Sequence, residues 1–108
     1  MTLTEQRCAA CAKGTKPLTQ NEAKTLLTEI PDWTLKEKSI EREFKFEDFE
    51  DAIAFVNRVA EIAQEENHHP DMHIYYNKVR IELSTHKIGG LSQNDFILAA
   101  KIDGVEKL

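Results

Sequence analysis

The stretch EDFEDAIAFVNRVAEIAQEENHHP, residues 47–70, carries the clearest periodic pattern in the sequence. Apolar side chains recur in it at steps of three and four residues, the spacing of a helix with one buried face. Acidic residues crowd its first turn, where carboxylates complement the positive end of the helix dipole. Pro70 disfavours helical backbone in its predecessor, which predicts a helix from Glu47 to Asn67 with His68 and His69 at its exit. The predicted buried face consists of Phe49, Ala52, Ile53, Val56, Val59, Ala60 and Ala63.

A pair of strands is predicted on each side of this helix. Residues 33–35 and 40–46 alternate between apolar and polar side chains, the period of a strand with one wet face. Arg42 interrupts the apolar side of the second of these strands. Residues 71–76 and 78–85 form the other pair, which turns around Asn77. The inward positions of the last strand are Val79, Ile81 and Leu83.

Two further helices are predicted near the ends of the chain. Residues 19–29 form a short amphipathic helix that Pro31 terminates, and residues 92–101 form a closing helix after two glycines. The resulting order predicts an α+β fold, a four-stranded antiparallel sheet with about three helices packed on one face. Short edge strands and one bare sheet face also predict an oligomer.

The length and composition fit one domain. The chain has 108 residues, of which 41% are hydrophobic and 31% charged, enough for one modest core. Residues 1–18 lack periodicity and are predicted to form a flexible N-terminal arm, which leaves residues 19–108 as the domain. Cys8 and Cys11 make a Cys-x-x-Cys pair in that arm. No second pair completes a four-thiolate zinc site, and no strand precedes the pair as in thioredoxin-like proteins.

The charge and hydropathy patterns argue against several classes of function. The net charge is −5, and the basic residues are scattered rather than gathered in a stripe, which disfavours direct nucleic-acid binding. The apolar runs are short and the N-terminus has no signal-like core, so neither membrane insertion nor export is expected. A cytoplasmic location is therefore expected.

Three of the four histidines fall at two element ends that one hairpin joins. They are His68 and His69 at the exit of the long helix, and His86 at the end of the last strand. Histidine is the side chain whose unperturbed pKa, about 6.5, allows proton transfer near neutral pH. The cluster therefore predicts an acid/base site in which the adjacent His68 and His69, pointing in different directions, do different work. His73 lies in the middle of a strand and has no place in this site.

Two other interpretations of the histidines stay open on the sequence alone. They can be surface residues that cap backbone carbonyls at the helix exit. They can also bind zinc, although an adjacent His-His pair is a poorer chelate than His-x-His or one-turn spacing on a helix. Asp95 likewise has a structural explanation, because Ser92 and Asp95 have the spacing of an N-terminal capping box.

The ordered motifs resemble those of the pterin-4a-carbinolamine dehydratases, also called 4a-hydroxytetrahydrobiopterin dehydratases. The resemblance extends from about Trp33 to Ile102, and the Cys8 to Cys11 arm resembles bacterial members. The motifs that carry it are QEENHHPD at 64–71, YNKV at 76–79, STH at 84–86, GLS at 90–92 and Asp95.

That resemblance implies a lyase that eliminates water from a 4a-hydroxytetrahydropterin to give the quinonoid dihydropterin, using neither a metal nor an organic cofactor. The substrate would come from an aromatic amino acid hydroxylase, so the enzyme would recycle the tetrahydrobiopterin used in phenylalanine hydroxylation. The family's fold and assembly imply a homodimer or homotetramer. The implied catalytic residues are His68, His69 and His86; the implied substrate-binding residues are Pro70, Thr85, Lys87 and Ile88; Gln64 and Asp95 are supporting residues.

Two positions depart from the family pattern. Gln64 stands where the family usually has an acidic residue, and an amide cannot stabilise a histidine cation by charge, which predicts lower activity or a shifted pH optimum. Met72 stands where Trp is common, which predicts altered substrate preference. The alternative function is a non-catalytic partner-binding module, because animal members of the family also act as dimerization cofactors of a homeodomain transcription factor.

Overall fold

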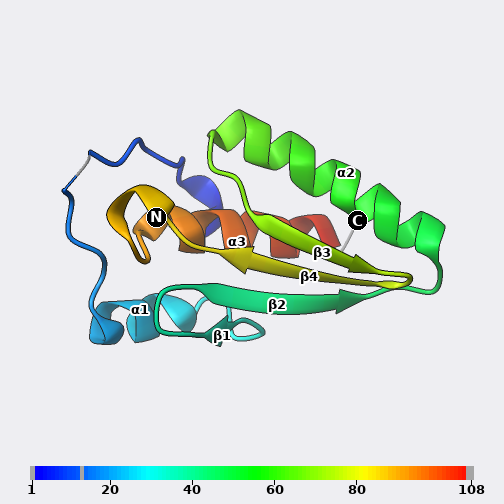
Figure 1. The fold of residues 1–108 in the computed structure, drawn as a ribbon, viewed down its shortest axis with the longest axis horizontal. Coiled ribbons are helices and arrows are strands. Elements are labelled where there is room, and N and C mark those ends of the chain that lie inside the picture. Colours follow the sequence, from blue (N-terminus) through cyan, green and yellow to red (C-terminus); the bar gives the residue numbers. More distant parts are fainter. Residues whose placement is uncertain (1, 13, 107–108) are drawn as a thin grey trace.

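The computed structural model describes residues 2–12 and 14–106 and has the α+β fold that the sequence predicted (Figure 1). The strands form an antiparallel sheet in the order β1-β2-β4-β3. In chain order the elements are η1 (Leu3–Glu5), α1 (Gln20–Leu27), β1 (Thr34–Leu35), β2 (Ile40–Lys45), α2 (Phe49–Glu66), β3 (Asp71–Tyr75), β4 (Lys78–Leu83), η2 (His86–Ile88) and α3 (Gln93–Glu106). No helix within the described ranges is both long and apolar enough to cross a membrane.

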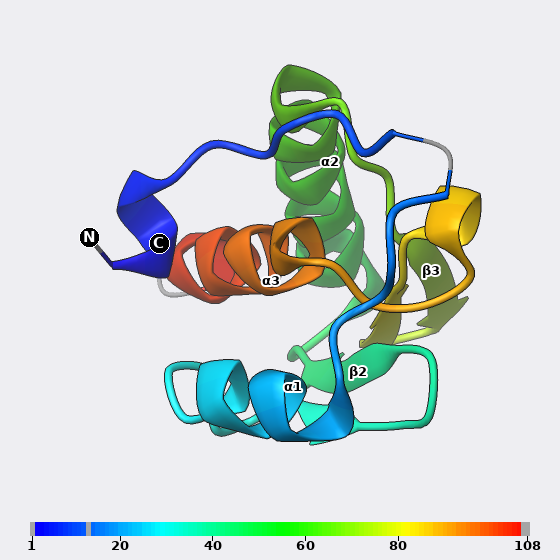
Figure 2. The same ribbon diagram turned by 90° about the vertical axis from the view of Figure 1, so that its left-hand side faces the viewer.

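The register of the sheet separates an apolar face from a polar one. Phe44, Val79 and Ile74 are paired across β2, β4 and β3, and directly paired residues share a face. On the other face the corresponding row is Glu43, Arg80 and His73. Helices α2 and α3 lie over the apolar face and cross each other there (Figure 2). The predicted inward positions of β4 are confirmed, since Val79, Ile81 and Leu83 are fully buried.

The buried face of α2 is shifted from the predicted one. It consists of Ala52, Phe55, Val59, Ala63 and Glu66. Phe49 was predicted to be buried but is 50% exposed, and Ala60 is also exposed. At about 100° per residue, both lie on the flank of the observed stripe rather than at its centre. The ring of Phe55 fills that centre, with its centroid 4.7 Å from that of Phe44.

The structure explains the arginine that interrupts β2. Arg42 Nη1 lies 2.6 Å from Asp103 Oδ1, and its guanidinium carbon lies 4.2 Å from the ring centroid of Phe44. Asp103 also accepts a hydrogen bond from the Trp33 indole. Burial raises the pKa of Asp103, against the lowering effect of these two hydrogen bonds. Arg42 therefore ties the sheet to α3, which continues to Glu106 rather than ending at residue 101 as predicted.

The N-terminal segment differs from the predicted arm, because part of it packs against the domain. Leu3 in η1 is 1% exposed and belongs to the hydrophobic core, where η1 contacts α3. Farther along, the Leu18 amide donates to the Leu91 carbonyl at 2.8 Å. A single buried residue such as Leu3 produces no repeating pattern of apolar side chains, so the periodicity of the sequence does not indicate that this segment packs against the domain.

Candidate functional site

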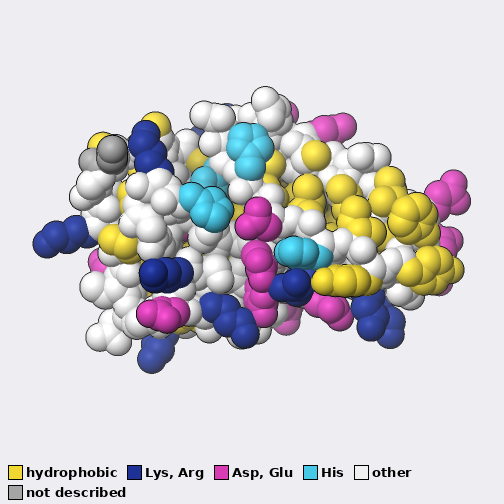
Figure 3. Space-filling model, viewed as in Figure 1, with side chains coloured by type: hydrophobic (Ala, Val, Ile, Leu, Met, Phe, Trp, Pro, Cys, Tyr) yellow, Lys and Arg dark blue, Asp and Glu magenta, His cyan; other side chains and the backbone are white. Residues whose placement is uncertain are grey.

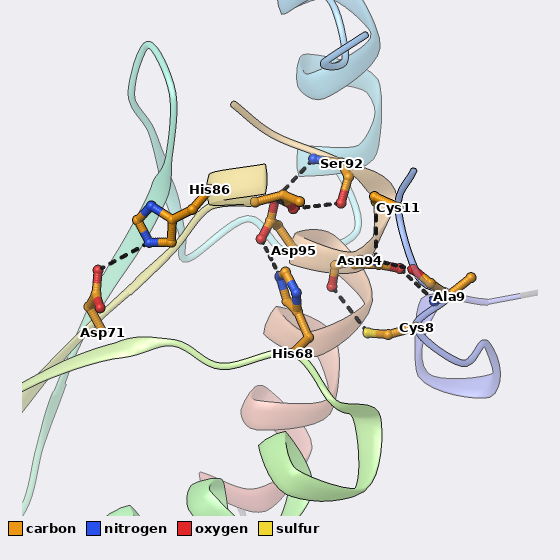
Figure 4. Close-up of polar contacts among 10 residues, drawn as sticks. Cys8, Ala9, Cys11, His68, Asp71, His86, Ser92, Asn94 and Asp95 are labelled. Atoms are coloured by element: carbon orange, nitrogen blue, oxygen red, sulfur yellow. Dashed lines mark hydrogen bonds and ion pairs between the residues drawn. The ribbon is translucent and has the colours of Figure 1, made fainter. Parts of the chain in front are cut away.

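The C-terminal end of α2 directs the first site histidine. Asn67 adopts a left-handed conformation with φ 52° and ψ 39°. The amide of His68 then donates back to the Ala63 carbonyl at 3.2 Å, the long bond of a Schellman motif. Pro70 follows and prevents the helix from resuming. The chain therefore leaves α2 abruptly, and His68 points toward the start of α3 (Figure 4).

His68 is paired with a buried carboxylate. Its Nε2 atom lies 2.6 Å from Oδ1 of Asp95, which is fully buried in the first turn of α3. The other oxygen, Oδ2, accepts hydrogen bonds at 2.9 Å from the Ser92 amide and from the Thr85 hydroxyl. Since an ionised carboxylate only accepts hydrogen bonds, this network assigns the Nε2 proton to His68 and leaves Nδ1 as the acceptor of the neutral ring.

The predicted capping box is present in one direction only. The Asp95 carboxylate accepts a hydrogen bond from the Ser92 amide, as in such a box. The Ser92 hydroxyl is instead 2.7 Å from the Thr85 hydroxyl. Thus Asp95 both caps α3 and holds His68, and its structural explanation does not exclude a role at the site.

The adjacent histidine has a different environment. His69 is exposed, and its Nε2 atom lies 3.2 Å from the Gln64 side-chain oxygen. Because that oxygen can only accept, the contact assigns the Nε2 proton to His69 as well. The sequence predicted that His68 and His69 would point differently, and their different partners confirm this.

The third histidine reaches the same pocket from η2. The side chain of His86 is 80% exposed, and its Nε2 atom lies 4.0 Å from Oδ2 of Asp71 (Figure 4). The pocket has a volume of about 430 Å³. Its lining consists of Cys8, Ala9, Ala10, Cys11, Glu66, Asn67, His68, His69, Ser84, Thr85, His86, Lys87 and Asn94.

Most of the predicted site residues therefore come together. Those in the lining are His68, His69, Thr85, His86 and Lys87, with Asp95 bonded behind His68 and Gln64 bonded to His69. Pro70 and Ile88 are not in the lining. His73 is on the polar sheet face, 3.8 Å from a Glu82 carboxylate oxygen. Within residues 2–12 and 14–106, no three His, Cys, Asp or Glu side chains are grouped to hold a metal ion.

The sequence interpretation missed the part of the pocket that the N-terminal segment supplies. Glu66 lies in the buried stripe of α2, and its carboxylate accepts the Cys8 amide at 2.8 Å and pairs with Lys101 at 3.0 Å. Burial acts to raise the pKa of Glu66, but the hydrogen bonds from Cys8 and Lys101 and the charges of Lys101 and Arg7 outweigh it, so this pKa is lowered. The position of Glu66 in register with the apolar stripe of α2 was the sequence feature that could have indicated a buried acidic residue here.

Comparison with known proteins identifies the family of this chain. The profile of the family described as pterin 4 alpha carbinolamine dehydratase matches residues 16–105. A protein of Halorhodospira halophila is 45% identical over 97% of this chain and 98% of its own length. One of Nitrosomonas eutropha is 46% identical over 94% of this chain and 90% of its own. Both bear the name pterin-4-alpha-carbinolamine dehydratase as a provisional assignment.

Two solved structures have a fold similar to that of this chain. The crystal structure of a transcriptional coactivator/pterin dehydratase from Brucella melitensis superposes with a TM-score of 0.79 at 32% identity, covering 83% of this chain and 98% of that one. A pterin dehydratase-like RuBisCO assembly factor of the alpha-carboxysome has a TM-score of 0.58 at 20% identity, covering 68% of this chain and 86% of its own, and shares the fold. Because the family profile covers most of the chain and relatives of nearly equal length match along it, the chain belongs to the pterin 4 alpha carbinolamine dehydratase family.

Proposed function

We propose that this chain eliminates water from a 4a-hydroxytetrahydropterin by histidine acid/base catalysis. A base removes the N5 proton, the N5–H electron pair forms the C4a–N5 double bond, and the C4a–O bond breaks. An acid protonates the departing hydroxyl, so the products are the quinonoid dihydropterin and one water molecule. Each positioned acid or base contributes about 10² to 10⁴-fold to such a reaction.

The observation that carries this proposal is the pairing of His68 with Asp95. Since Nε2 is bonded to the carboxylate at 2.6 Å, Nδ1 is the atom left to accept a proton. The imidazolium formed by that transfer would be stabilised by the buried charge beside it. These features suit His68 to the role of base for the N5 proton.

His86 has the properties required of the acid. Its side chain is 80% exposed, so solvent can return its proton after each turnover, and its Nε2 atom lies 4.0 Å from the Asp71 carboxylate. His69, held by the neutral Gln64, would complete the set by hydrogen bonding the substrate. Thr85 and Lys87 from the lining, with the neighbouring Pro70 and Ile88, are proposed to contact the pterin ring.

The cellular context follows from the substrate class. A 4a-hydroxytetrahydropterin is released by aromatic amino acid hydroxylases, so we propose that the enzyme supports one of these in pterin recycling. A cytoplasmic location stays a prediction.

Self-association is proposed on separate grounds. Edge strand β3 ends in an exposed apolar patch made of Ile74, Tyr75 and Tyr76, with the half-exposed Phe49 of α2. Apolar side chains gather at that end of the molecule in the space-filling view (Figure 3). A free strand edge beside such a patch suits a homodimer or homotetramer.

The test is the rate of carbinolamine decay in a coupled phenylalanine hydroxylase assay without added metal. We expect acceleration by the wild type, a loss of about 10²-fold or more in His68→Ala, and full activity in His73→Ala, the matched control outside the pocket. Absence of acceleration by the folded wild-type protein would overturn the dehydratase proposal and favour a partner-binding module.

A further inference from the structure

One wall of the pocket comes from a segment remote from the histidines in sequence. Cys8, Ala9, Ala10 and Cys11 line the same cavity as His68 and His86. This segment is a short run without regular secondary structure, between η1 and α1. Its position therefore depends on the side chains that hold it.

Asn94 of α3 clamps the middle of this segment. Its side-chain Nδ2 donates to the Ala9 carbonyl at 2.6 Å, while its Oδ1 accepts from the Ala9 amide at 2.9 Å. One buried amide thus satisfies both backbone groups of one residue, as a neighbouring strand would do. The same Nδ2 lies 3.7 Å from Cys11 Sγ (Figure 4).

Glu66 of α2 holds the preceding residue. Its side chain is 4% exposed and accepts the Cys8 amide at 2.8 Å. The carboxylate is itself fixed by Lys101 Nζ at 3.0 Å and by Arg7 Nε at 2.9 Å. Two buried polar side chains from two helices therefore fix consecutive residues of the segment. A chain end that only covered apolar surface would not need these specific hydrogen bonds to its backbone.

We propose that the Cys8 to Cys11 segment is a fixed, substrate-contacting wall of the pterin pocket and that Asn94 and Glu66 are the positioning residues that hold it there. This inference rests on the proposed dehydratase function and extends it to residues 8–11. The wall would contact the bound ring system, while the histidines perform the proton transfers.

The chemistry of the wall suits a neutral, flat ligand. Cys8 is half-buried and its thiol donates to the Asn94 carbonyl at 3.5 Å. Burial, followed by the nearby charge of Glu66, raises the pKa of Cys8 to about 12. The thiol therefore stays protonated near neutral pH and behaves as a small apolar group rather than as a nucleophile. Such a surface can pack against an uncharged heteroaromatic ring.

The first experiment measures contact between the wall and a ligand. The full chain carrying Cys8→Ser keeps Cys11 as its only thiol. Its alkylation by iodoacetamide is timed with increasing 7,8-dihydrobiopterin, whose binding is measured separately by calorimetry. We expect protection of Cys11 that saturates with the dissociation constant found by calorimetry. Pterin binding without protection would overturn the wall while leaving the dehydratase proposal standing.

The second experiment tests the clamp. We expect Asn94→Ala to raise KM on the order of tenfold with little change in kcat, because two hydrogen bonds to Ala9 are lost, and to accelerate Cys11 alkylation. Gln93→Ala is the control, since Gln93 Nε2 donates to Gln6 Oε1 at 2.6 Å and thus also touches the N-terminal segment, but outside the pocket. Equal KM and alkylation rates in both variants would overturn the clamp.

If the Asn94 variant fails to fold, the protection measurement decides alone. Wild-type protein that neither binds the pterin nor turns over would overturn both proposals together.

Discussion

His68 Nε2 lies 2.6 Å from Oδ1 of Asp95, and the other oxygen of that carboxylate accepts a hydrogen bond from the Ser92 amide at the N-terminal end of α3. One buried group therefore serves helix formation and the site at once. The chain segments that meet there are the exit of α2, the end of β4 through Thr85, and the start of α3. Any change at Asp95 should consequently be seen both in stability and in the protonation of His68.

Asp95→Asn is expected to change both the stability of the fold and the tautomer of His68, and the two changes can be measured separately. The amide can keep the size of the side chain but must turn an NH₂ group toward one of its present donors, which should lower the free energy of unfolding by about 1 to 3 kcal/mol. If its oxygen stays on the Ser92 side, the NH₂ faces His68 and favours the other tautomer. Denaturant titration measures the first effect, and nitrogen NMR of the imidazole with a pH profile of kcat measures the second. Unchanged tautomer and pH profile, with stability alone reduced, would assign Asp95 a purely structural role.

Gln64→Glu is expected to move the pH profile of turnover. A carboxylate at the position of an oxygen now 3.2 Å from His69 Nε2 would favour the protonated ring, so His69 should lose its proton at a higher pH in the variant. Proton NMR titration of the histidines checks this directly. Gln64→Met, similar in length but without charge, is the control and should not move the titration upward.

Much of the fold could be predicted because it rests on periodic burial. The alternation in β4 and the three-and-four spacing in α2 identified both elements, and Pro70 correctly marked the helix exit. The contacts of Asn94 and Glu66 with residues 8 and 9 could not be predicted in the same way. They join backbone groups far apart in the chain, and neither local propensity nor periodicity encodes which polar side chain will meet them.

Likewise, the sequence predicted a histidine cluster but not the environment of each ring. Adjacent His68 and His69 are equivalent in composition, and only the left-handed Asn67 turn and the position of α3 give one a buried carboxylate and the other an amide. Their difference in environment is therefore a tertiary property.

Glu66→Gln is expected to change how stability depends on pH. The pKa of Glu66 in the folded protein is below its ordinary 4.5, so its ionised form stabilises the fold above that pH. This contribution is lost as the pH falls through the lowered value. The wild type should therefore exceed the variant in unfolding free energy at neutral pH, and the difference should shrink in acid. Urea titrations from neutral to strongly acidic pH measure it; a difference independent of pH would show that the carboxylate charge is not what stabilises this position.

Ile74→Lys is expected to disrupt self-association without unfolding the protomer. Ile74 is 42% exposed on edge strand β3, so the substitution removes little buried area within one chain, whereas a charge in a paired apolar surface would be costly. Sedimentation velocity should show a smaller species, with the far-ultraviolet circular dichroism of the wild type retained. Lys24→Ala, at an exposed position of α1 away from the patch, is the control and should sediment like the wild type. If Ile74→Lys keeps the wild-type sedimentation coefficient while the wild type is oligomeric, the interface lies on another surface, and the bare polar face of the sheet becomes the next to examine.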